Sequence, residues 1–541
     1  MLGLMQDQPL LISNLIEFAS RHHHDGEIVS RRVEGDLHRY TYREAARRSR
    51  QVANAIEKLG LAFSDRVATL AWNGYRHFEL YFGITGSGRV VHTINPRLAP
   101  DQVAWIANHA EDQVLCFDLT FLPIVKAVWS KCTTVKHWVA LCDANALPAD
   151  TGIPHLRSYE AWIGGESDDY AWPQFDEKSA AALCYTSGTT GNPKGALYSH
   201  RSTILHAYGG ALPDALDLSA RDSVLPVVPM FHVNAWGIPY GAALTGAKLV
   251  FPGAALDGKS VYELLEAERV TMAAGVPTVW LGLLNHMAEH KLRFSTLQRT
   301  VIGGSACPPA MIRAFKDQYG VTVLHAWGMT EMSPLGTVCN LKGKQQELPP
   351  DRQMDVLVKQ GRAVFGVEMR IVDPEGKELP WDGKVSGDLH VKGPWIISSY
   401  FKGEGGDPLV DGWFPTGDVA SIDPDGFLQI TDRSKDVIKS GGEWISSIDV
   451  ENIAMAHPAV AMAACIAVAH PKWDERPLLV VMRKPGTPAT REDILAFFEG
   501  KVAKWQIPDD VVFVEAIPLG ATGKMQKNKL RDQFRDHRLP G

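Results

Sequence analysis

The sequence predicts an α/β protein with a large N-terminal domain and a small α+β C-terminal domain. Up to about residue 330, short β-branched segments alternate with stretches of helical apolar spacing. After about residue 360 the sequence pattern changes to short strand-like segments broken by Gly, Pro and Asp. Alternation of strand-like and helical segments returns in the last hundred residues. The length of 541 residues also exceeds what one hydrophobic core organises, so more than one domain is expected.

The N-terminal part is predicted to begin with a short amphipathic helix and to continue as a parallel sheet. Residues 1–21 carry Gln, Asp and Glu among apolar side chains and lack a basic head, which favours a helix over a secretory signal. Alternating strands and helices imply parallel strands joined by right-handed crossovers, and this alternation recurs from about 180 to 330. The early strand-like segments are 66–72, 90–94 and 113–118, and the helical segments are 75–86 and 99–110.

The later part predicts two further units. Short strands broken by turn residues indicate an antiparallel sheet or a small barrel, and a compact α+β domain follows it with its boundary near 432–436. We therefore expect an N-terminal domain of residues 1–432 and a C-terminal domain of residues 433–541. The segments behind this expectation are strands in 367–373, 387–391, 411–432, 460–470, 477–483 and 511–517, and a helix over 491–505.

Bulk composition excludes several classes of protein. A net charge of −7 disfavours a general nucleic-acid binder. The sequence contains no run of about 18 apolar residues, so stable membrane insertion is not expected. The seven cysteines form no C-x-x-C pair, so free thiols in a reducing compartment are expected, which indicates a cytoplasmic protein. Three adjacent histidines at 22–24 point in different directions, so they do not predict a metal site.

Two glycine-rich stretches compete as phosphate-binding loops. "GAALDGKS", residues 253–260, matches the P-loop pattern G-x-x-x-x-G-K-[ST] between a predicted strand and a predicted helix. However, Asp257 would place a carboxylate beside phosphate oxygens, and no convincing magnesium-binding strand follows. "YTSGTTGNPKG", residues 185–195, follows an apolar strand and offers three glycines, several hydroxyls and Lys194, although turns have the same composition.

A series of ordered motifs favours the second loop. "YTSGTTGNPKG", "GMTE", "GWFPTGD", "DRSKDVIKSGGEWIS" and "ATGKMQK" occur in that order along the chain. Together they resemble the acyl-adenylate-forming superfamily, over nearly the whole length. "VLPVVPMFHVNAW", "AGVPTVW", "KSGGEWISS" and "AKWQIPD" are most similar to medium- and long-chain fatty-acyl-CoA synthetases and to the 3-methylmercaptopropionate–CoA ligases. The resemblance implies ATP and Mg²⁺ as cofactors, coenzyme A and a small carboxylic acid as substrates, and an acyl-AMP intermediate with release of AMP and pyrophosphate.

The resemblance also implies roles for individual residues. The loop 186–194 would wrap the β and γ phosphates, Thr186 and Glu331 would hold Mg²⁺, and Asp418 would bind the ribose. Trp327 would stack on the adenine, although many relatives carry Tyr at this position. The implied ATP site comprises Thr186, Ser187, Gly188, Thr189, Thr190, Lys194, Gly304, Ser305, Ala306, Trp327, Gly328, Met329, Thr330, Glu331, Asp418, Arg433, Lys435 and Lys439.

The remaining implied roles concern the acid, the thiol and the catalytic cation. Lys524 is matched to the catalytic lysine of adenylation, with a solvated basic tail as the alternative from composition. In relatives the small C-terminal domain is mobile and rotates between the two half-reactions, and 432–435 fits such a hinge by position. The acyl site is matched to His232, Val233, Asn234 and Trp236, and the CoA site to Gly441, Gly442 and Glu443.

Other functions remain open at this point. The alternatives are an adenylation enzyme that loads a carrier protein, a P-loop NTPase and a non-enzymatic sensor of acyl groups or nucleotides. Relatives are often homodimers, and by analogy a homodimer is expected here. The length of the acyl chain is not predicted, because one methylene changes binding by only about 1 kcal/mol.

Overall fold

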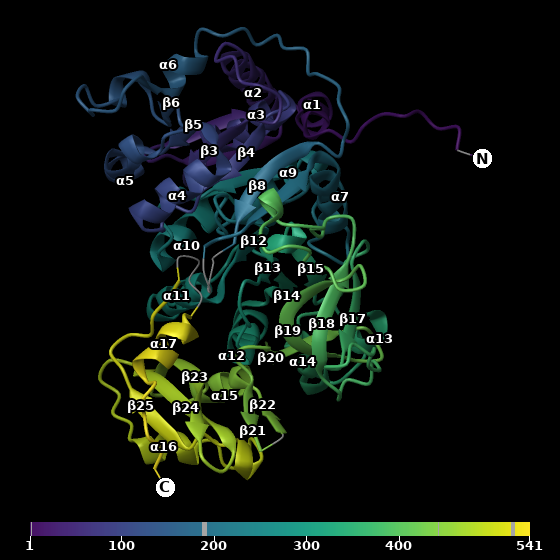
Figure 1. Ribbon diagram of the computed structural model, residues 1–541, viewed down its shortest axis with the longest axis vertical. Helices are drawn as coiled ribbons and strands as arrows, with labels where there is room; N and C mark the ends of the chain where they lie inside the picture. The colour runs from purple at the N-terminus through teal and green to yellow at the C-terminus, as the bar shows by residue number, and fades with distance from the viewer. Residues whose placement is uncertain (2, 187–191, 442, 521–524, 541) are drawn as a thin grey trace.

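The computed structural model describes residues 1, 3–186, 192–441, 443–520 and 525–540. Its strands form four sheets, two large ones in the N-terminal part, a small one beside them and one in the C-terminal part (Figure 1). The predicted fold class is confirmed: both large sheets are mainly parallel, and the third sheet is antiparallel.

The first large sheet has seven strands, and β9 alone runs antiparallel to its neighbour. Its strands, in spatial order, are β7 (Leu156–Ser158), β6 (His137–Ala140), β5 (Asp112–Phe117), β3 (Arg66–Leu70), β4 (Val90–Thr93), β8 (Ala180–Tyr185) and β9 (Gly195–Ser199). The associated helices are α2 (Tyr42–Glu57), α3 (Tyr75–Gly86), α4 (Pro100–Ala110), α5 (Leu122–Val128) and α6 (Tyr159–Ile163). The predicted strands and helices of this region are therefore present, and the loop 186–194 joins β8 to β9.

The second large sheet has nine strands. In spatial order they are β16 (Arg362–Ala363), β15 (Leu335–Val338), β14 (Thr322–Gly328), β13 (Arg299–Ile302), β12 (Met272–Gly275), β10 (Ser223–Pro226), β11 (Lys248–Phe251), β1 (Glu27–Arg31) and β2 (Leu37–Thr41). Its helices are α1 (Ile12–His22), α7 (His200–Ala211), α8 (Val233–Trp236), α9 (Ile238–Thr245), α10 (Gly258–Ala267), α11 (Pro277–Glu289), α12 (Pro309–Arg313), α13 (Gly343–Gln346) and α14 (Pro350–Leu357). Helices α1, α2, α3, α7 and α9 share the largest hydrophobic core with residues from both large sheets.

The third sheet is a four-stranded antiparallel sheet, so the small barrel allowed by the sequence does not form. It contains β17 (Glu368–Val372), β18 (Gly387–Lys392), β19 (Phe414–Ile422) and β20 (Leu428–Arg433). The last strand, β20, ends at the expected boundary between the two parts of the chain.

The C-terminal part contains a five-stranded sheet with its own core. Its strands are β21 (Ile438–Ser440), β22 (Glu443–Ile445), β23 (Val460–His470), β24 (Asp474–Arg483) and β25 (Asp510–Phe513), and its helices are α15 (Ser447–Met455), α16 (Arg491–Ala496) and α17 (Lys527–Gln533). Helices α15 and α17 both contact β23.

Two predicted helices are longer than the observed ones. The N-terminal helix begins only at Ile12, after Pro9, instead of within the first residues. The helix expected over 491–505 ends at Ala496 because the chain turns at Gly500, whose φ is 73°. No helix in the described part of the chain is long and apolar enough to cross a bilayer.

Candidate active site

The stretch 253–260 that matches the P-loop pattern forms no phosphate cradle. Helix α10 begins at Gly258, and the side chain of Asp257 accepts a hydrogen bond from the backbone N–H of Ser260 at 3.0 Å. A helix N-terminus binds phosphate through its free N–H groups, but here a carboxylate already occupies that end. Lys259 is exposed, and its Nζ lies 3.8 Å from Oε1 of Glu263 on the same helix. The stretch is therefore a capped strand–turn–helix connection.

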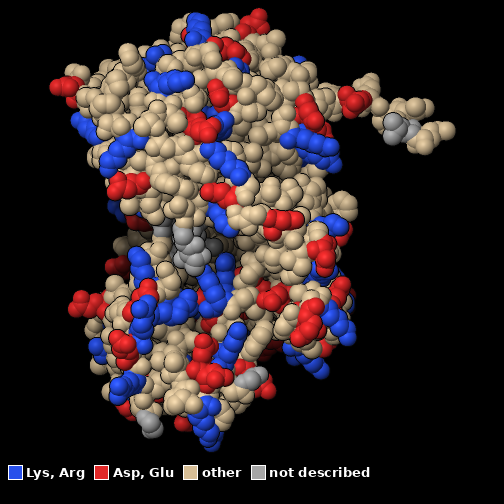
Figure 2. All heavy atoms as spheres, viewed as in Figure 1, with Lys and Arg blue, Asp and Glu red and all other residues tan. Residues whose placement is uncertain are grey.

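Most of the other described site residues line a cleft between the N-terminal and C-terminal parts or a smaller pocket beside it. This cleft has a volume of about 1390 Å³, and a neighbouring pocket of about 420 Å³ opens beside it. Figure 2 shows Lys and Arg side chains gathering around the hollow between the two parts. The basic residues that line the cleft are Arg97, Arg433, Lys435, Lys484, Lys527, Lys529 and Arg531. Such a positively charged cleft between domains suits a polyphosphate ligand.

The described ends of the 185–195 loop close as a β-hairpin. The N–H of Thr186 donates to the carbonyl of Lys194 at 2.9 Å, and the N–H of Lys194 donates to the Thr186 hydroxyl at 3.1 Å. Both residues line the smaller pocket. The hairpin thus fixes where the loop enters and leaves the pocket.

Some predicted site residues cannot be placed. Ser187, Gly188, Thr189, Thr190, Gly442 and the expected catalytic Lys524 lie outside the described residues.

Glu331 lies in the same pocket as Thr186 and Lys194, and its side chain is held by a residue that the sequence analysis missed. The hydroxyl of Tyr400 donates to Oε1 of Glu331 at 2.8 Å. The ammonium of Lys194 lies 4.8 Å from the centroid of the Tyr400 ring, within range of a cation–π interaction. Tyr400 belongs to a loop without a recognisable pattern in the sequence, so only the folded chain reveals it.

Asp418 is buried and receives two donors. Its Oδ2 accepts a hydrogen bond from Nε1 of Trp327 at 2.9 Å, and its Oδ1 pairs with Nε of Arg433 at 2.9 Å. Since a carboxylate offers about four acceptor positions, two remain for other donors such as hydroxyl groups. The three residues come from β14, β19 and the end of β20, so they meet only after folding.

The segment 303–306 follows β13 and lines the cleft. A Cβ atom at Gly303 would lie 3.2 Å from the Trp236 ring and 2.9 Å from the Ala326 carbonyl, so only glycine fits there. Behind the segment, Nε2 of His325 accepts a hydrogen bond from the Cys307 N–H at 3.2 Å. These contacts fix the wall opposite Trp327.

The predicted acyl-binding residues share an unusual backbone. Val233, Asn234, Ala235 and Trp236 have φ angles of 46°, 51°, 51° and 57°, and Gly237 follows at 75°. Residues 233–237, which include the short element α8, therefore form a left-handed turn and not a regular α-helix, and non-glycine residues rarely adopt such a turn. The turn places His232, Val233 and Trp236 along the smaller pocket.

Family comparisons match these features to known proteins. Residues 16–401 match the family described as "AMP-binding enzyme", and residues 449–524 match its C-terminal domain. The chain belongs to the AMP-binding enzyme family. It is 54% identical over 536 residues to a 3-methylmercaptopropionyl-CoA ligase of Ruegeria lacuscaerulensis, covering 99% of both chains. It is 51% identical to a medium-chain-fatty-acid–CoA ligase of Ectopseudomonas oleovorans, covering 99% of this chain and 98% of that one.

The fold comparison agrees with this assignment. The crystal structure of an anthranilate CoA ligase in complex with anthranoyl-AMP has a TM-score of 0.85 and 26% sequence identity, covering 98% of this chain and 99% of that chain. The expectation of an ATP-dependent acyl-CoA ligase is thus confirmed at the level of reaction class. The alternative that this chain is a P-loop NTPase is therefore excluded.

Within this AMP-binding enzyme, the predicted CoA residues that the structure describes do not line the cleft, whereas described residues on either side of the predicted catalytic lysine do. Residues 519–520 and 525–529 line the cleft together with Trp327 and Asp418, whereas Lys439, Gly441 and Glu443 do not. The N–H of Lys439 donates to Glu475 at 2.8 Å, and the N–H of Gly441 donates to the Trp473 carbonyl at 2.9 Å. The predicted contacts of these residues with ATP and CoA therefore stay predictions that need another domain orientation.

Proposed function

We propose that this ligase activates a short thioether acid such as 3-methylmercaptopropionate or a medium-chain fatty acid. Support comes from the two relatives at 54% and 51% identity, whose names state these two acids. The observation that carries the proposal is the cleft with its adjoining pocket, which are lined by the ends of the hydroxyl-rich loop, Asp418 and residues 525–529.

The proposed reaction has two steps. The acid's carboxylate oxygen attacks the α-phosphorus of ATP, the bond to the β-phosphate breaks, and pyrophosphate leaves. The CoA thiol then loses its proton and attacks the acyl carbon, and AMP leaves. Negative charge on the α-phosphate oxygens rises in the first transition state, so nearby cations lower that barrier. Arg433 and Lys435 line the cleft beside Asp418, and Lys524 is the proposed catalytic cation.

The proposed nucleotide contacts use the geometry around Asp418. Its remaining acceptor positions would take the ribose hydroxyls while Trp327 and Arg433 hold the carboxylate in place. The flat face of Trp327 and the wall at 303–306 would enclose the adenine. Burial lowers the pKa of Lys435, and an anionic phosphate bound nearby would shift that pKa in the opposite direction.

The residues present fit a magnesium ion bound together with ATP. Magnesium prefers hard oxygen ligands and usually takes one or two from the protein, with water and phosphate supplying the others. Thr186 and Glu331 offer a hydroxyl and a carboxylate in one pocket, and no group of three or more His, Cys, Asp or Glu side chains among the described residues is placed to hold a metal ion by itself. Bound Mg²⁺ would neutralise phosphate charge during transfer.

Trp236 supports the choice of acid. Its ring packs against Gly303 and lies next to Gly304, at the side of the pocket where the acyl group would enter. We propose that a short acyl chain fits beside this ring where it stands and that a longer chain must displace it. This argument favours the thioether acid as the first substrate to test.

An adenylation enzyme that loads a carrier protein is the second candidate. It shares the first half-reaction and differs in the thiol acceptor. No described contact separates the two, but both relatives named above are CoA ligases. Free CoA is therefore the proposed acceptor.

The test is acid-dependent exchange between ATP and labelled pyrophosphate, followed by a chase with CoA. The panel contains straight-chain acids from three to eighteen carbons and methylthio acids of matched length. We expect the highest kcat/KM for 3-methylmercaptopropionate or a medium-chain acid, and conversion of the adenylate to acyl-CoA in the chase. Exchange without acyl-CoA formation would instead favour a carrier-protein acceptor, and absence of exchange for every acid would refute the proposal.

A homodimer in the cytoplasm completes the proposal. Exposed apolar side chains on the N-terminal part include Phe18 of α1, Tyr208 of α7 and Leu212 directly after α7. All seven cysteines are free and buried, which agrees with a reducing compartment. Sedimentation of the purified chain measures its oligomeric state directly.

A further inference from the structure

Lys527 lies three residues after the proposed catalytic lysine, and it is a buried lysine instead of part of a solvated tail. Only 10% of its side chain is exposed. Its ammonium lies 2.7 Å from Oε1 of Glu451 and donates to the Ser447 hydroxyl at 2.5 Å. Burial by itself lowers the pKa of Lys527, but the carboxylates of Glu451, Asp432 and Asp436 outweigh it and the net shift is upward. The lysine therefore stays charged.

Ser447 connects this lysine to Asp432 at the end of β20. Oδ2 of Asp432 accepts from the Ser447 N–H at 2.6 Å, and Oδ1 accepts from the Ser447 hydroxyl at 3.0 Å. Ser447 is the first residue of α15, so the Asp432 carboxylate also lies at the positive end of that helix. Asp432 and Ser447 are 1% and 0% exposed, where hydrogen bonds to charged groups are strongest. We call Asp432, Ser447, Glu451 and Lys527 the boundary cluster.

The boundary cluster joins the two parts of the chain. Asp432 belongs to β20, the last strand of the four-stranded sheet in the N-terminal part. Ser447 and Glu451 belong to α15 and Lys527 to α17, both in the C-terminal part. With the proposed boundary after Asp432, a rotation of the C-terminal domain moves the last three residues away from the first. The contacts between Asp432 and Ser447 therefore exist in the orientation seen here and break on rotation.

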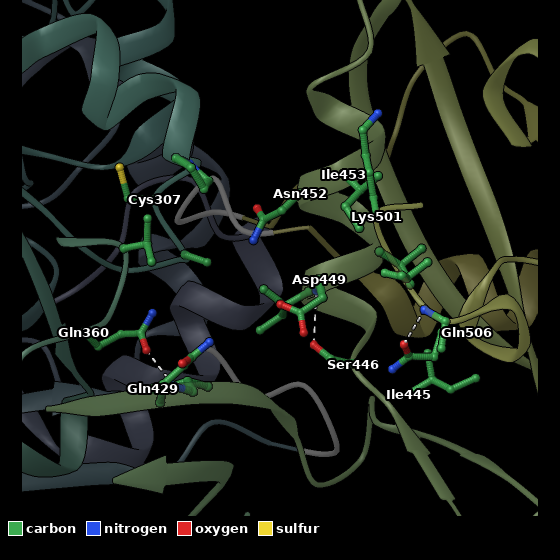
Figure 3. Close-up of a pocket in the computed structure, with 18 of the residues that line it drawn as sticks. Cys307, Gln360, Gln429, Ile445, Ser446, Asp449, Asn452, Ile453, Lys501 and Gln506 are labelled. Carbon is green, nitrogen blue, oxygen red and sulfur yellow. Dashed lines mark hydrogen bonds between the residues drawn. The ribbon is translucent and has the colours of Figure 1, made fainter. Parts of the chain in front are cut away.

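A hollow beside the cluster shows why these contacts matter. Figure 3 shows a cavity between the N-terminal residues Cys307, Gln360 and Gln429 and the C-terminal residues Asp449 and Asn452, and its volume is about 570 Å³. The first turns of α15 form part of its wall. Since the two parts are not packed together across this space, apolar burial contributes little there. Beside this space, polar contacts at the N-terminus of α15 join the two parts.

We propose that the boundary cluster holds the C-terminal domain in the orientation for adenylation, and that Asp432 and Lys527 are positioning residues for that half-reaction. Lys527 begins α17, whose first residues line the cleft, so the same contact that fixes the domain also fixes the start of the helix that follows Lys524. Neither residue needs to touch the substrate. The inference rests on the proposed function, because it assigns the orientation to one of its two half-reactions.

The test measures the two half-reactions separately in Asp432→Asn and Ser447→Ala. Asp432→Asn removes the charge with little change of shape, and Ser447→Ala removes the hydroxyl that links Asp432 to Lys527. We expect ATP–pyrophosphate exchange to fall about tenfold, the size of one hydrogen bond to a charged group, as the population shifts between orientations. Thioester formation from supplied acyl-AMP and CoA should be retained or faster. Ser447→Ala keeps the test decisive if Asp432→Asn fails to fold.

Asp510→Asn is the matched control. Asp510 is a carboxylate whose partners, Arg491 at 2.5 Å and His537 at 2.9 Å, both belong to the C-terminal part. Its loss should lower stability without changing the ratio of the two half-reaction rates. A ratio that is unchanged in both cluster variants, or changed equally in the control, would overturn the proposal.

A distance measurement gives a readout that does not depend on activity. All seven native cysteines are buried, so spin labels can be placed on exposed positions through Lys259→Cys and Ala496→Cys. The wild type should show one dominant interdomain distance, and Asp432→Asn should shift or broaden it; an unchanged distribution would contradict the inference. If the wild type shows no acid-dependent exchange while the distance still responds to Asp432→Asn, the proposed function fails and the cluster's role in holding the domains stands.

Discussion

At the scale of single residues, two donors hold the carboxylate of Asp418 in the proposed nucleotide pocket before any ligand binds. Trp327 and Arg433 hold one carboxylate oxygen each, at 2.9 Å in both cases. The sequence predicts that Trp327, at a position where many relatives carry Tyr, stacks on the adenine. The structure adds that its indole N–H donates to the predicted ribose-binding carboxylate.

Trp327→Phe tests this role because it keeps an aromatic face and removes the N–H. A hydrogen bond to a charged group contributes about 1.5–3 kcal/mol, so we expect ATP to bind at least about tenfold more weakly, with a smaller change in kcat. Titration calorimetry measures the affinity for ATP, and steady-state kinetics measure kcat and KM. Equal affinity in the variant and the wild type would mean that the indole acts through its face alone.

Residue roles could be predicted from sequence only where a motif fixes them. The phosphate-loop ends, Glu331 and Asp418 were named as site residues because their motifs are long and ordered, and each of them lines the cleft or the pocket beside it. Tyr400 and Lys527 were not found as site residues, since a hydroxyl in a loop and a lysine in a basic stretch carry no pattern. Their roles depend on partners 69 and 76 positions away in the chain, 331 from 400 and 451 from 527, which only the fold brings together.

At the scale of elements, the left-handed turn 233–237 is the feature that sequence patterns could least anticipate. "FHVNAW" contains a β-branched residue and an alanine, which disfavour positive φ, and yet Val233 and Ala235 adopt 46° and 51°. Its surroundings hold it there. The Tyr81 hydroxyl donates to Asn234 at 3.3 Å, and Asn73 accepts from the Met230 N–H at 2.6 Å. The turn aims Trp236 at Gly303, so strain is stored beside the proposed acyl site.

Gly237→Ala tests how tightly the turn is confined. Gly237 has φ 75°, and an added Cβ would lie 2.7 Å from the His206 ring. Backbone strain and the clash together should lower the free energy of unfolding by about 2–4 kcal/mol. Gly60→Ala is the control, because Gly60 has φ 68° and open space at its Cβ, and it should cost about 1 kcal/mol. Urea unfolding of both variants measures the difference, and equal losses would show that the turn is loosely packed.

At the scale of the whole molecule, alternation of strands and helices predicted both large sheets, because parallel strands with crossovers leave a strong periodic signal. The ends of elements were less predictable. The helix expected to 505 stops at Ala496, and the first helix starts at Ile12, since a positive-φ glycine and a proline override local spacing. How the sheets assemble depends on long-range contacts that no local pattern contains. Three such contacts are backbone N–H groups that donate to buried histidines.

These histidines predict how the molecule responds to acid. His200, His206 and His325 accept N–H groups of Ile12, Leu335 and Cys307 at 3.1, 3.1 and 3.2 Å. Each accepting nitrogen must be unprotonated. Burial lowers the pKa of His200 to about 3 and those of His206 and His325 to about 4, from an ordinary value of 6.5. Because the folded pKa values are depressed, their stabilising contribution is complete above pH 6.5 and is lost as the pH falls toward the folded values.

Each histidine should therefore cost about 2 kcal/mol of stability between pH 7.5 and pH 5. Asp118 acts in the opposite direction, because burial raises its pKa to about 7 and its protonation favours the folded state below that pH. The measurement must therefore be a difference between variants. Urea unfolding from pH 8 to pH 5 should give a shallower acid loss in His206→Gln than in the wild type, whereas His24→Gln, at an exposed position, should leave the slope unchanged. Parallel slopes for the wild type and His206→Gln would show that the ring is protonated in the folded chain, and the contact between α7 and β15 would then not depend on its neutrality.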